Sequence, residues 1–411
     1  MKNIALILSI LFLALPQIGA AKNVKKEWRK YKKRGVHMLK TNYPKNKVLA
    51  AAKGFDYIKG YEILDNYEID GIHKFEKNEV RIFNPLEHEV DYNIYKYRIK
   101  RMKKDGTPQD IKFYYYRSNI PYQGKTAAGK RPLLIISPTI KGILGGTFAN
   151  VEPTWANYFA ARGINVIILK LGEKLYTPGQ KTLELNKWIQ DKVIAIRMMV
   201  DFANETLKDE IDTKRVALYG ASLGGIRSVI AMSLEPKERI AAGVTVATGG
   251  NFADLWVTSN QKEVVAMREF MMEIEGINTN FMPARPFSKK KKKLYKKHYK
   301  GVKDKDKYDN AMHEVYKREK LYKIMQKINN VEPLQFIGLR KTLVEDLFMF
   351  ISLKDSKVRS KNQLELWQAI GQPEFSSNGR LNHSPYILLV AKLKLDTAFA
   401  EIQERLDKVL D

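Results

Sequence analysis

Short apolar runs bounded by glycine and proline recur between residues 132 and 247 of the chain. Their β-branched content and length are typical of strands that are buried on both faces. They fall at residues 132–136, 164–169, 215–219 and 241–247. Apolar positions within residues 185–203 instead recur at helical spacing, which predicts an amphipathic helix that covers a sheet. Strands alternating with helices predict a parallel α/β sheet.

A different pattern precedes this region. Apolar or aromatic residues alternate with polar ones at residues 79–83, 91–99 and 111–116. Such alternation predicts half-buried antiparallel strands. Edge strands explain the interleaved aromatic and lysine side chains with fewer assumptions than a nucleic-acid surface does. We therefore expect antiparallel strands that extend one edge of the sheet, and no specific nucleic-acid partner.

The sequence GASLG at residues 220–224 lies between one predicted strand and a predicted helix at residues 225–234. A serine on so sharp a turn from strand to helix forms a nucleophile elbow. The turn brings the strand close to the helix, so it needs small residues two positions before and after the serine, and glycine stands at both. Because the flanking elements fit as well, Ser222 is the candidate nucleophile.

A carboxylate and a histidine follow in the order that a Ser-His-Asp triad takes downstream of such an elbow. An apolar run after Asp346 is short enough for a central strand and ends at Asp355. His383 lies in a polar loop directly before an apolar-periodic helix. Asp355 and His383 are the candidate acid and base, and Asp346 and Asp254 are the alternatives for the acid.

These side-chain types support acyl transfer. The histidine would remove the proton of the serine, and the aspartate would hold the histidine tautomer and stabilise the imidazolium. The oxyanion that forms needs N–H donors. Leu223 N–H, at the start of the helix, is one candidate, and Thr139 or Ile140 N–H is the second.

With these motifs the chain resembles the α/β-hydrolase family over residues 130–410. The resemblance is carried by the elbow, by residues 355–358 with the helix that follows, and by the loop of His383. It implies a mostly parallel central sheet with helices on both faces, a triad at the C-terminal edge of the sheet, and an inserted helical lid. The chain departs from the family at residues 137–142, SPTIKG, where many members carry His-Gly or Gly-Gly.

The size and composition of the chain favour one elaborated catalytic domain. Residues 4–15 form an apolar run shorter than the roughly 20 residues of a membrane span, and small residues follow it, with cleavage expected near Ala20 or Ala21. The protein is therefore expected to be exported to the periplasm or secreted, and an uncleaved anchor is the alternative reading of this segment. The expected organisation is a signal peptide at 1–21, a basic segment at 22–48, a catalytic domain at 49–256 and 331–411, and a lid at 257–330.

The net charge of +27 is concentrated in two segments. Residues 22–48 carry eleven lysines and arginines against one acid, and residues 285–327 carry seventeen against five. This clustering favours contact with an anionic membrane or envelope polymer, whereas the alternative is a solvated loop or helix face. The candidate contacts are Lys289, Lys290, Lys291, Lys292 and Lys293.

No cofactor or metal is expected. The sequence has no cysteine, no His-x-x-x-His and no H-E-x-x-H motif, so it offers no recognisable zinc-binding motif. Because no disulfide can form, stability must come from packing. The expected function is that of an exported serine hydrolase that cleaves a carboxylic ester, with an amide as the less favoured substrate. The expected substrate is a small-molecule or lipid-like ester. The alternative is a hydrolase-fold protein that binds anionic envelope polymers or membrane and whose triad is vestigial.

Overall fold

The computed structural model describes residues 26, 29, 43–69, 92–139, 151–170, 182–260, 264, 268, 323–326 and 329–409. The predicted signal peptide, most of the basic segment, the predicted strand at 79–83, most of the predicted lid and the five lysines at 289–293 lie outside these residues. The expectations that concern them stay predictions. Among the described residues, none of the helices combines the length and hydropathy needed to cross a membrane.

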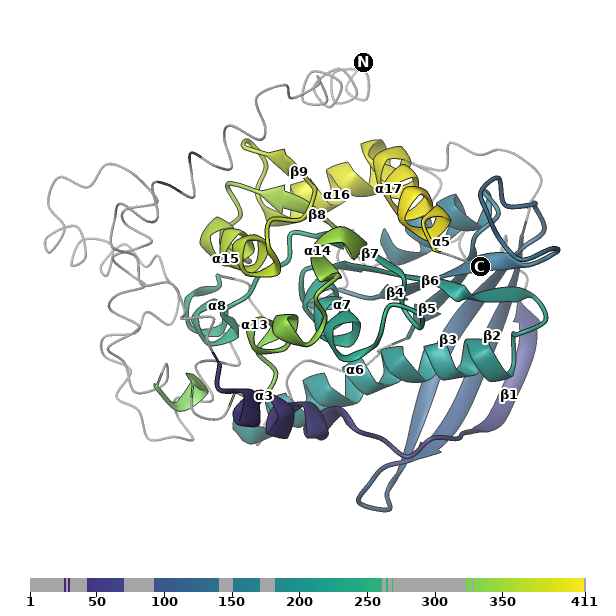
Figure 1. Cartoon of the computed structure of the whole chain (residues 1–411), viewed down its shortest axis with the longest axis horizontal. Helices are drawn as coiled ribbons and strands as arrows, with labels where there is room; N and C mark the ends of the chain where they lie inside the picture. Colours follow the sequence, from purple (N-terminus) through teal and green to yellow (C-terminus); the bar gives the residue numbers. More distant parts are fainter. Residues whose placement is uncertain are drawn as a thin grey trace, which may run out of the picture.

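A nine-stranded mixed sheet organises the described part of the chain (Figure 1). Its strands, in spatial order, are β1 (Glu62–Ile69), β2 (Tyr92–Met102), β3 (Pro108–Ser118), β5 (Asn165–Leu169), β4 (Arg131–Ser137), β6 (Ile211–Ala221), β7 (Ala242–Val246), β8 (Leu347–Ser352) and β9 (Phe375–Asn378). The pairs from β1 to β5 are antiparallel, and those from β5 through β4 to β9 are parallel. The mostly parallel sheet with antiparallel N-terminal strands is thereby confirmed.

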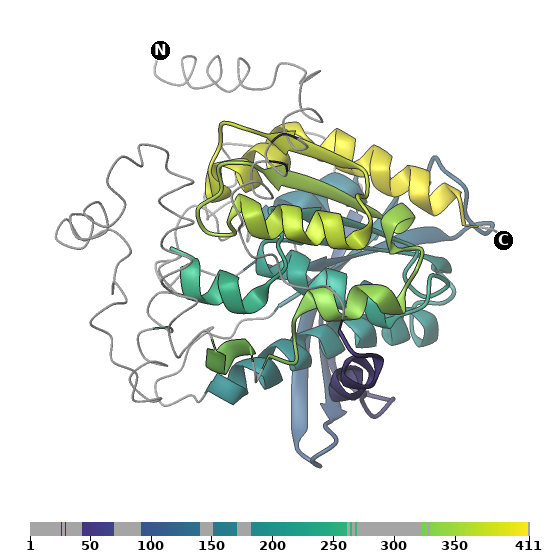
Figure 2. The same cartoon turned by 60° about the vertical axis from the view of Figure 1, so that its left-hand side comes forward.

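Helices cover both faces of this sheet (Figures 1 and 2). One face carries α5 (Val151–Ala160), α16 (His383–Leu393) and α17 (Leu395–Asp407), and the other carries α3 (Lys45–Ala52), α6 (Thr182–Glu205), α7 (Leu223–Leu234), α8 (Phe252–Thr258), α13 (Pro333–Phe336) and α15 (Ser360–Ile370). The described chain also contains the short elements η1 (Lys53–Phe55), η4 (Ile337–Leu339) and α14 (Leu343–Asp346).

Strand β4 shows why successive positions inside a central strand are apolar. Leu133 and Ile135 belong to the hydrophobic core beneath α6, whereas Leu134 and Ile136 belong to the separate core beneath α5 and α17. All four are fully buried, so a strand with helices on both faces has no solvent-facing position for a polar side chain. The predicted apolar face of α6 packs on the first of these cores, as Ile189 and Val193 show.

Candidate active site

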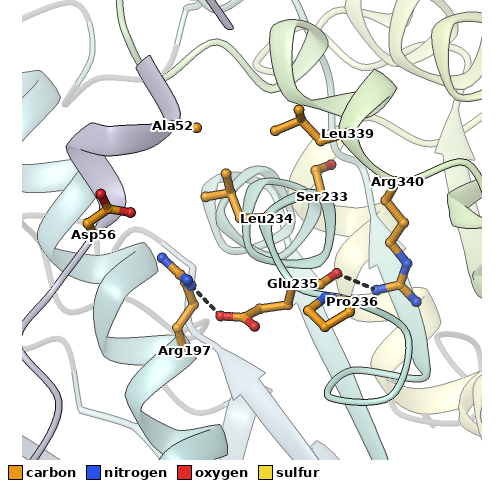
Figure 3. Close-up of a pocket in the computed structure, with 9 residues that line it drawn as sticks. All are labelled: Ala52, Asp56, Arg197, Ser233, Leu234, Glu235, Pro236, Leu339 and Arg340. Atoms are coloured by element: carbon orange, nitrogen blue, oxygen red, sulfur yellow. Dashed lines mark hydrogen bonds and ion pairs between the residues drawn. The ribbon is translucent and has the colours of Figure 1, made fainter. Parts of the chain in front are cut away.

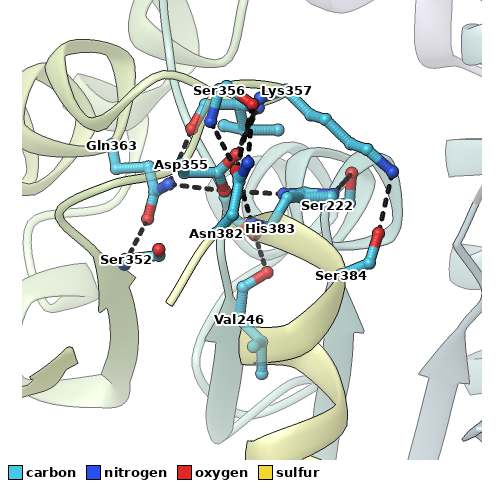
Figure 4. Close-up of polar contacts among 12 residues, drawn as sticks. Ser222, Val246, Ser352, Asp355, Ser356, Lys357, Gln363, Asn382, His383 and Ser384 are labelled. Carbon is cyan, nitrogen blue, oxygen red and sulfur yellow. Dashed lines mark hydrogen bonds and ion pairs between the residues drawn. The ribbon is translucent and has the colours of Figure 1, made fainter. Parts of the chain in front are cut away.

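Ser222 stands between the last residue of β6 and the first residue of α7, at the carboxyl edge of the parallel strands. Its backbone has φ 53° and ψ −122°, a region that residues with a side chain rarely adopt. Its N–H donates to the carbonyl oxygen of Val246 at the end of β7, at 2.8 Å (Figure 4). The chain thus turns abruptly enough to lift the serine side chain out of the sheet.

The glycines of the turn let the strand and the helix approach each other. A Cβ atom on Gly220 would lie 2.6 Å from the carbonyl carbon of Gly224, and one on Gly225 would lie 1.8 Å from Oγ1 of Thr248. Neither distance is compatible with a side chain larger than hydrogen. The glycine at 220 therefore serves the close approach that the sequence pattern predicts.

The structure brings Ser222, His383 and Asp355 together from three separate segments (Figure 4). Nε2 of His383 lies 3.0 Å from Oγ of Ser222, and Nδ1 lies 2.6 Å from Oδ2 of Asp355. His383 and Asp355 are both buried. With the proton on Nδ1, the imidazole donates to the carboxylate and presents an acceptor to the serine hydroxyl, which is the arrangement that activates a serine for nucleophilic attack.

Backbone N–H groups of the loop after β8 bind the carboxylate of Asp355, which lies in the same loop. Oδ1 accepts from the N–H groups of Lys357 and Val358, at 2.8 and 3.0 Å, in the local turn that an aspartate side chain favours. Oδ2 accepts from Nε2 of Gln363, at 3.0 Å, as well as from the histidine. Each carboxylate oxygen is therefore fixed by two donors.

Asn382 ties the loop of the histidine to the loop of the acid. Its Oδ1 accepts from the N–H of His383, at 2.8 Å, and so caps the N-terminus of α16. The same oxygen accepts from the N–H of Ser356 at 2.9 Å. Nearby, Nζ of Lys357 donates to Oγ of Ser384 at 2.8 Å. These contacts were not predicted from the sequence, although an asparagine shortly before an apolar-periodic helix is a residue type that favours a cap.

The two alternative acids are engaged in other pairs. Asp346, at the opposite end of β8, pairs with Arg340 at 2.6 Å and with Lys237 at 2.9 Å. Asp254, in α8, lies 3.5 Å from Nζ of Lys361 and accepts from Nδ2 of Asn362 at 3.0 Å. Of the three candidate aspartates, Asp355 is the one that contacts the histidine.

The candidate donors to an oxyanion differ in their surroundings. Leu223 is the first residue of α7, so its N–H is one of the four without a partner inside the helix. The N–H of Thr139 donates to Oε1 of Glu152 at 2.9 Å, and the Thr139 hydroxyl donates to the same oxygen. The N–H of Thr139 could donate to an oxyanion only after its hydrogen bond to Glu152 had broken. Ile140 lies outside the described residues.

A buried carboxylate supports the loop that follows β7. Glu332 accepts from the N–H groups of Asn251, Phe252 and Leu334. Burial raises its pKa to about 7, because removal from water disfavours the charged form more than the three N–H donors favour it.

In the part of the chain that the structure describes, no three His, Asp or Glu side chains gather into a group that could hold a metal ion.

A pocket of about 360 Å³ lies at the C-terminal end of α7 (Figure 3). Ser222 lies at the opposite end of this helix. Its lining residues are Ala52, Asp56, Arg197, Ser233, Leu234, Glu235, Pro236, Leu339 and Arg340. Charged groups in it are already paired: Arg197 donates to the Glu235 carboxylate at 2.5 Å, and Arg340 bonds three backbone carbonyls and Asp346. Because it lies at the opposite end of the helix, the pocket is separate from the contacts of Ser222, His383 and Asp355.

No family model matches the chain, and neither does any curated protein. Among solved structures, the chain is similar to the acetyl xylan esterase from Paenibacillus sp. R4, with 13% identity over 88% of this chain and 92% of that one and a TM-score of 0.48. It is also similar to the cell wall degrading esterase LipA from Xanthomonas oryzae, with 15% identity over 86% and 99% of the two chains and a TM-score of 0.48.

The fold is identified by features of the chain itself. A mostly parallel sheet carries helices on both faces, a serine sits on a strained turn between a central strand and a helix, and an acid and a histidine follow in that order at the ends of later strands. This combination defines one architecture. The chain has the α/β-hydrolase fold.

Proposed function

We propose that the protein is a serine hydrolase that cleaves a carboxylic ester through an acyl-enzyme on Ser222. The observation that supports this most directly is the position of His383, whose two ring nitrogens lie 3.0 Å from the Ser222 hydroxyl and 2.6 Å from the Asp355 carboxylate. One imidazole placed between a hydroxyl and a buried carboxylate is what general-base activation of a serine requires.

In the proposed reaction, His383 removes the hydroxyl proton of Ser222 as its oxygen attacks the ester carbonyl carbon. Asp355 holds the imidazole and stabilises its cationic form. The carbonyl oxygen becomes an oxyanion, to which the N–H of Leu223 donates. His383 then protonates the departing alcohol, and water attacks the acyl-enzyme in the same manner to release the carboxylic acid and restore the serine.

The alternative is a binding protein that keeps the hydrolase fold with a vestigial triad. Two features favour the enzyme. The serine retains a backbone conformation that costs about 1–3 kcal/mol and has no evident use in a binding surface. The carboxylate also keeps two donors on each oxygen, so the acid loop remains organised for one orientation of Asp355.

Labelling with a fluorophosphonate probe tests the proposal on the full chain. The probe reacts with activated serines, so we expect the parent protein to be labelled at Ser222 and the Ser222→Ala variant to remain unlabelled. The same variant should lose turnover of p-nitrophenyl esters by a factor of about 10³ or more. Esters of graded acyl length would then rank the substrates. Failure of the folded parent to react with the probe would favour the binding protein.

A further inference from the structure

Gln363 connects three parts of the acid loop through one side chain (Figure 4). It lies in the first turn of α15 and is fully buried. Its Oε1 accepts from the N–H of Ser352, the last residue of β8, at 2.9 Å. Its Nε2 donates to Oδ2 of Asp355 at 3.0 Å and to the carbonyl oxygen of Val358 at 2.7 Å.

These partners leave the amide one orientation. An amide rotated by half a turn would place its oxygen against the Asp355 carboxylate and the Val358 carbonyl, and its NH₂ group against the N–H of Ser352. All three contacts would then be repulsive in a site without exposed surface. The donor is therefore held toward Asp355 by the other two bonds.

The oxygen that receives Gln363 is also the one that receives His383. Oδ1 of Asp355 is occupied by two backbone N–H groups. Without the amide donor, Oδ2 would keep the imidazole as its one remaining side-chain partner. The carboxylate could then change its orientation while Oδ1 kept its two backbone hydrogen bonds. The amide thus sets the direction from which Oδ2 meets the histidine.

We infer that Gln363 is a positioning residue that holds Asp355 in the orientation required for its bond to His383. As a statement about rate, the inference rests on the proposed function of the triad. As a statement about geometry, it does not, since the contact between carboxylate and imidazole can be observed without substrate. Gln363 does not touch the reacting atoms and acts through Asp355.

Two substitutions separate this role from support of the fold. Gln363→Met matches the volume but removes every hydrogen bond. Gln363→Glu keeps an oxygen that can accept from the N–H of Ser352, and so retains the anchor to β8, but it can donate to Asp355 only while the new carboxyl group carries a proton. The matched control is Gln335→Met, because Gln335 is also buried and lies in α13.

We expect Gln363→Met to lower kcat for a soluble ester about tenfold, with KM within about twofold, because the interaction acts on the triad and not on substrate binding. For Gln363→Glu, the ratio of its kcat to that of the parent should fall as the pH rises and the new carboxyl group loses its proton. Asp355 contacts this position directly and His383 contacts Asp355, whereas Lys361 and Glu365 are two residues away on the same helix. Gln335→Met should keep the parent kcat.

Proton NMR supplies a readout that needs no turnover. The Nδ1 proton of His383, held between imidazole and carboxylate, should give a downfield resonance in the parent that is absent in His383→Gln. That resonance should broaden or vanish in Gln363→Met and persist in Gln335→Met. A Gln363→Met protein with the parent resonance and the parent kcat would overturn the inference. Lack of Ser222-dependent turnover in the parent would instead count against the proposed function, while the resonance would still decide the role of Gln363.

Discussion

Gly224 lies so close to Ser137 that a Cβ atom on residue 224 would be 2.2 Å from the carbonyl oxygen of Ser137. This contact joins the first turn of α7 to the end of β4. The neighbouring atom is backbone, so it cannot move aside as a flexible side chain could. The position of the helix after the elbow therefore depends on the absence of a side chain at residue 224.

Gly224→Ala should lower the free energy of unfolding by at least about 2 kcal/mol, because the helix or the strand must shift to admit the methyl group. Gly338→Ala is the matched control, since a Cβ atom there would meet nothing within 4 Å. It should change stability by less than about 1 kcal/mol. Urea denaturation of both variants measures the difference, and equal losses would contradict the contact.

Ser222 is predicted to reduce the stability of the protein that it serves. Its φ of 53° is strained for any residue with a Cβ atom, whereas glycine tolerates it. The free energy of unfolding of Ser222→Gly should therefore be about 1 kcal/mol higher than that of Ser222→Ala, although neither variant can form an acyl-enzyme. Both variants lack the hydroxyl group, so the difference between them reports the backbone conformation alone. If the alanine variant is the more stable one, the strain at this turn is relieved by some other means.

Asp355→Asn should lower kcat by about 10² to 10⁴ with little change in KM, because asparagine no longer stabilises the imidazolium or selects its tautomer. Asp346→Asn breaks the buried pair with Arg340 and so should reduce stability. Its folded fraction should nevertheless turn over ester near the parent rate. Steady-state kinetics corrected for active-site concentration distinguish the two, and the reverse pattern would assign the acid to Asp346.

The stability of the fold should depend on pH through Glu332. Its pKa is raised from 4.5 to about 7 by burial, so the folded protein holds a proton that the unfolded chain has released across this window. The contribution of Glu332 to the free energy of unfolding is therefore largest below pH 4.5. It falls by on the order of 3 kcal/mol as the pH rises from 4.5 to 7. Glu332→Gln should remove this part of the slope in denaturation measured at several pH values. Gln335→Met, at a buried residue that carries no ionisable group and lies three positions away, should leave the slope unchanged.

The central strands have a local signature in the sequence, and so do the three residues Ser222, Asp355 and His383, which the structure brings into contact. Strands β4 and β8 are apolar at successive positions, since helices cover both of their faces. Ser222 lies in a glycine motif, and Asp355 follows the end of a strand. Strand β1 had no such signature. Its side chains are mostly exposed, and it is held as an edge strand by pairing with β2 and by ion pairs such as Lys100 with Glu62.

The polar residues around the triad could not be predicted, because tertiary packing alone chooses their partners. Gln363 belongs to a helix whose sequence does not indicate that this position faces an aspartate eight residues earlier. The bond from Thr139 to Glu152 likewise joins two segments whose approach depends on how α5 packs against the sheet. Sequence periodicity indicates which face of a helix is buried, but it does not indicate which buried polar group meets which.

The two contacts of His383 in the candidate triad span very different lengths of chain. The acid and the histidine are 28 residues apart, whereas the serine and the histidine are 161 residues apart. Loop-closure entropy grows with the length of chain that must be closed, so the short contact can form while much of the molecule is still unfolded, and the long one must wait until distant strands have joined. Regain of serine reactivity during refolding would therefore report the late assembly of the whole sheet rather than the ordering of any one loop.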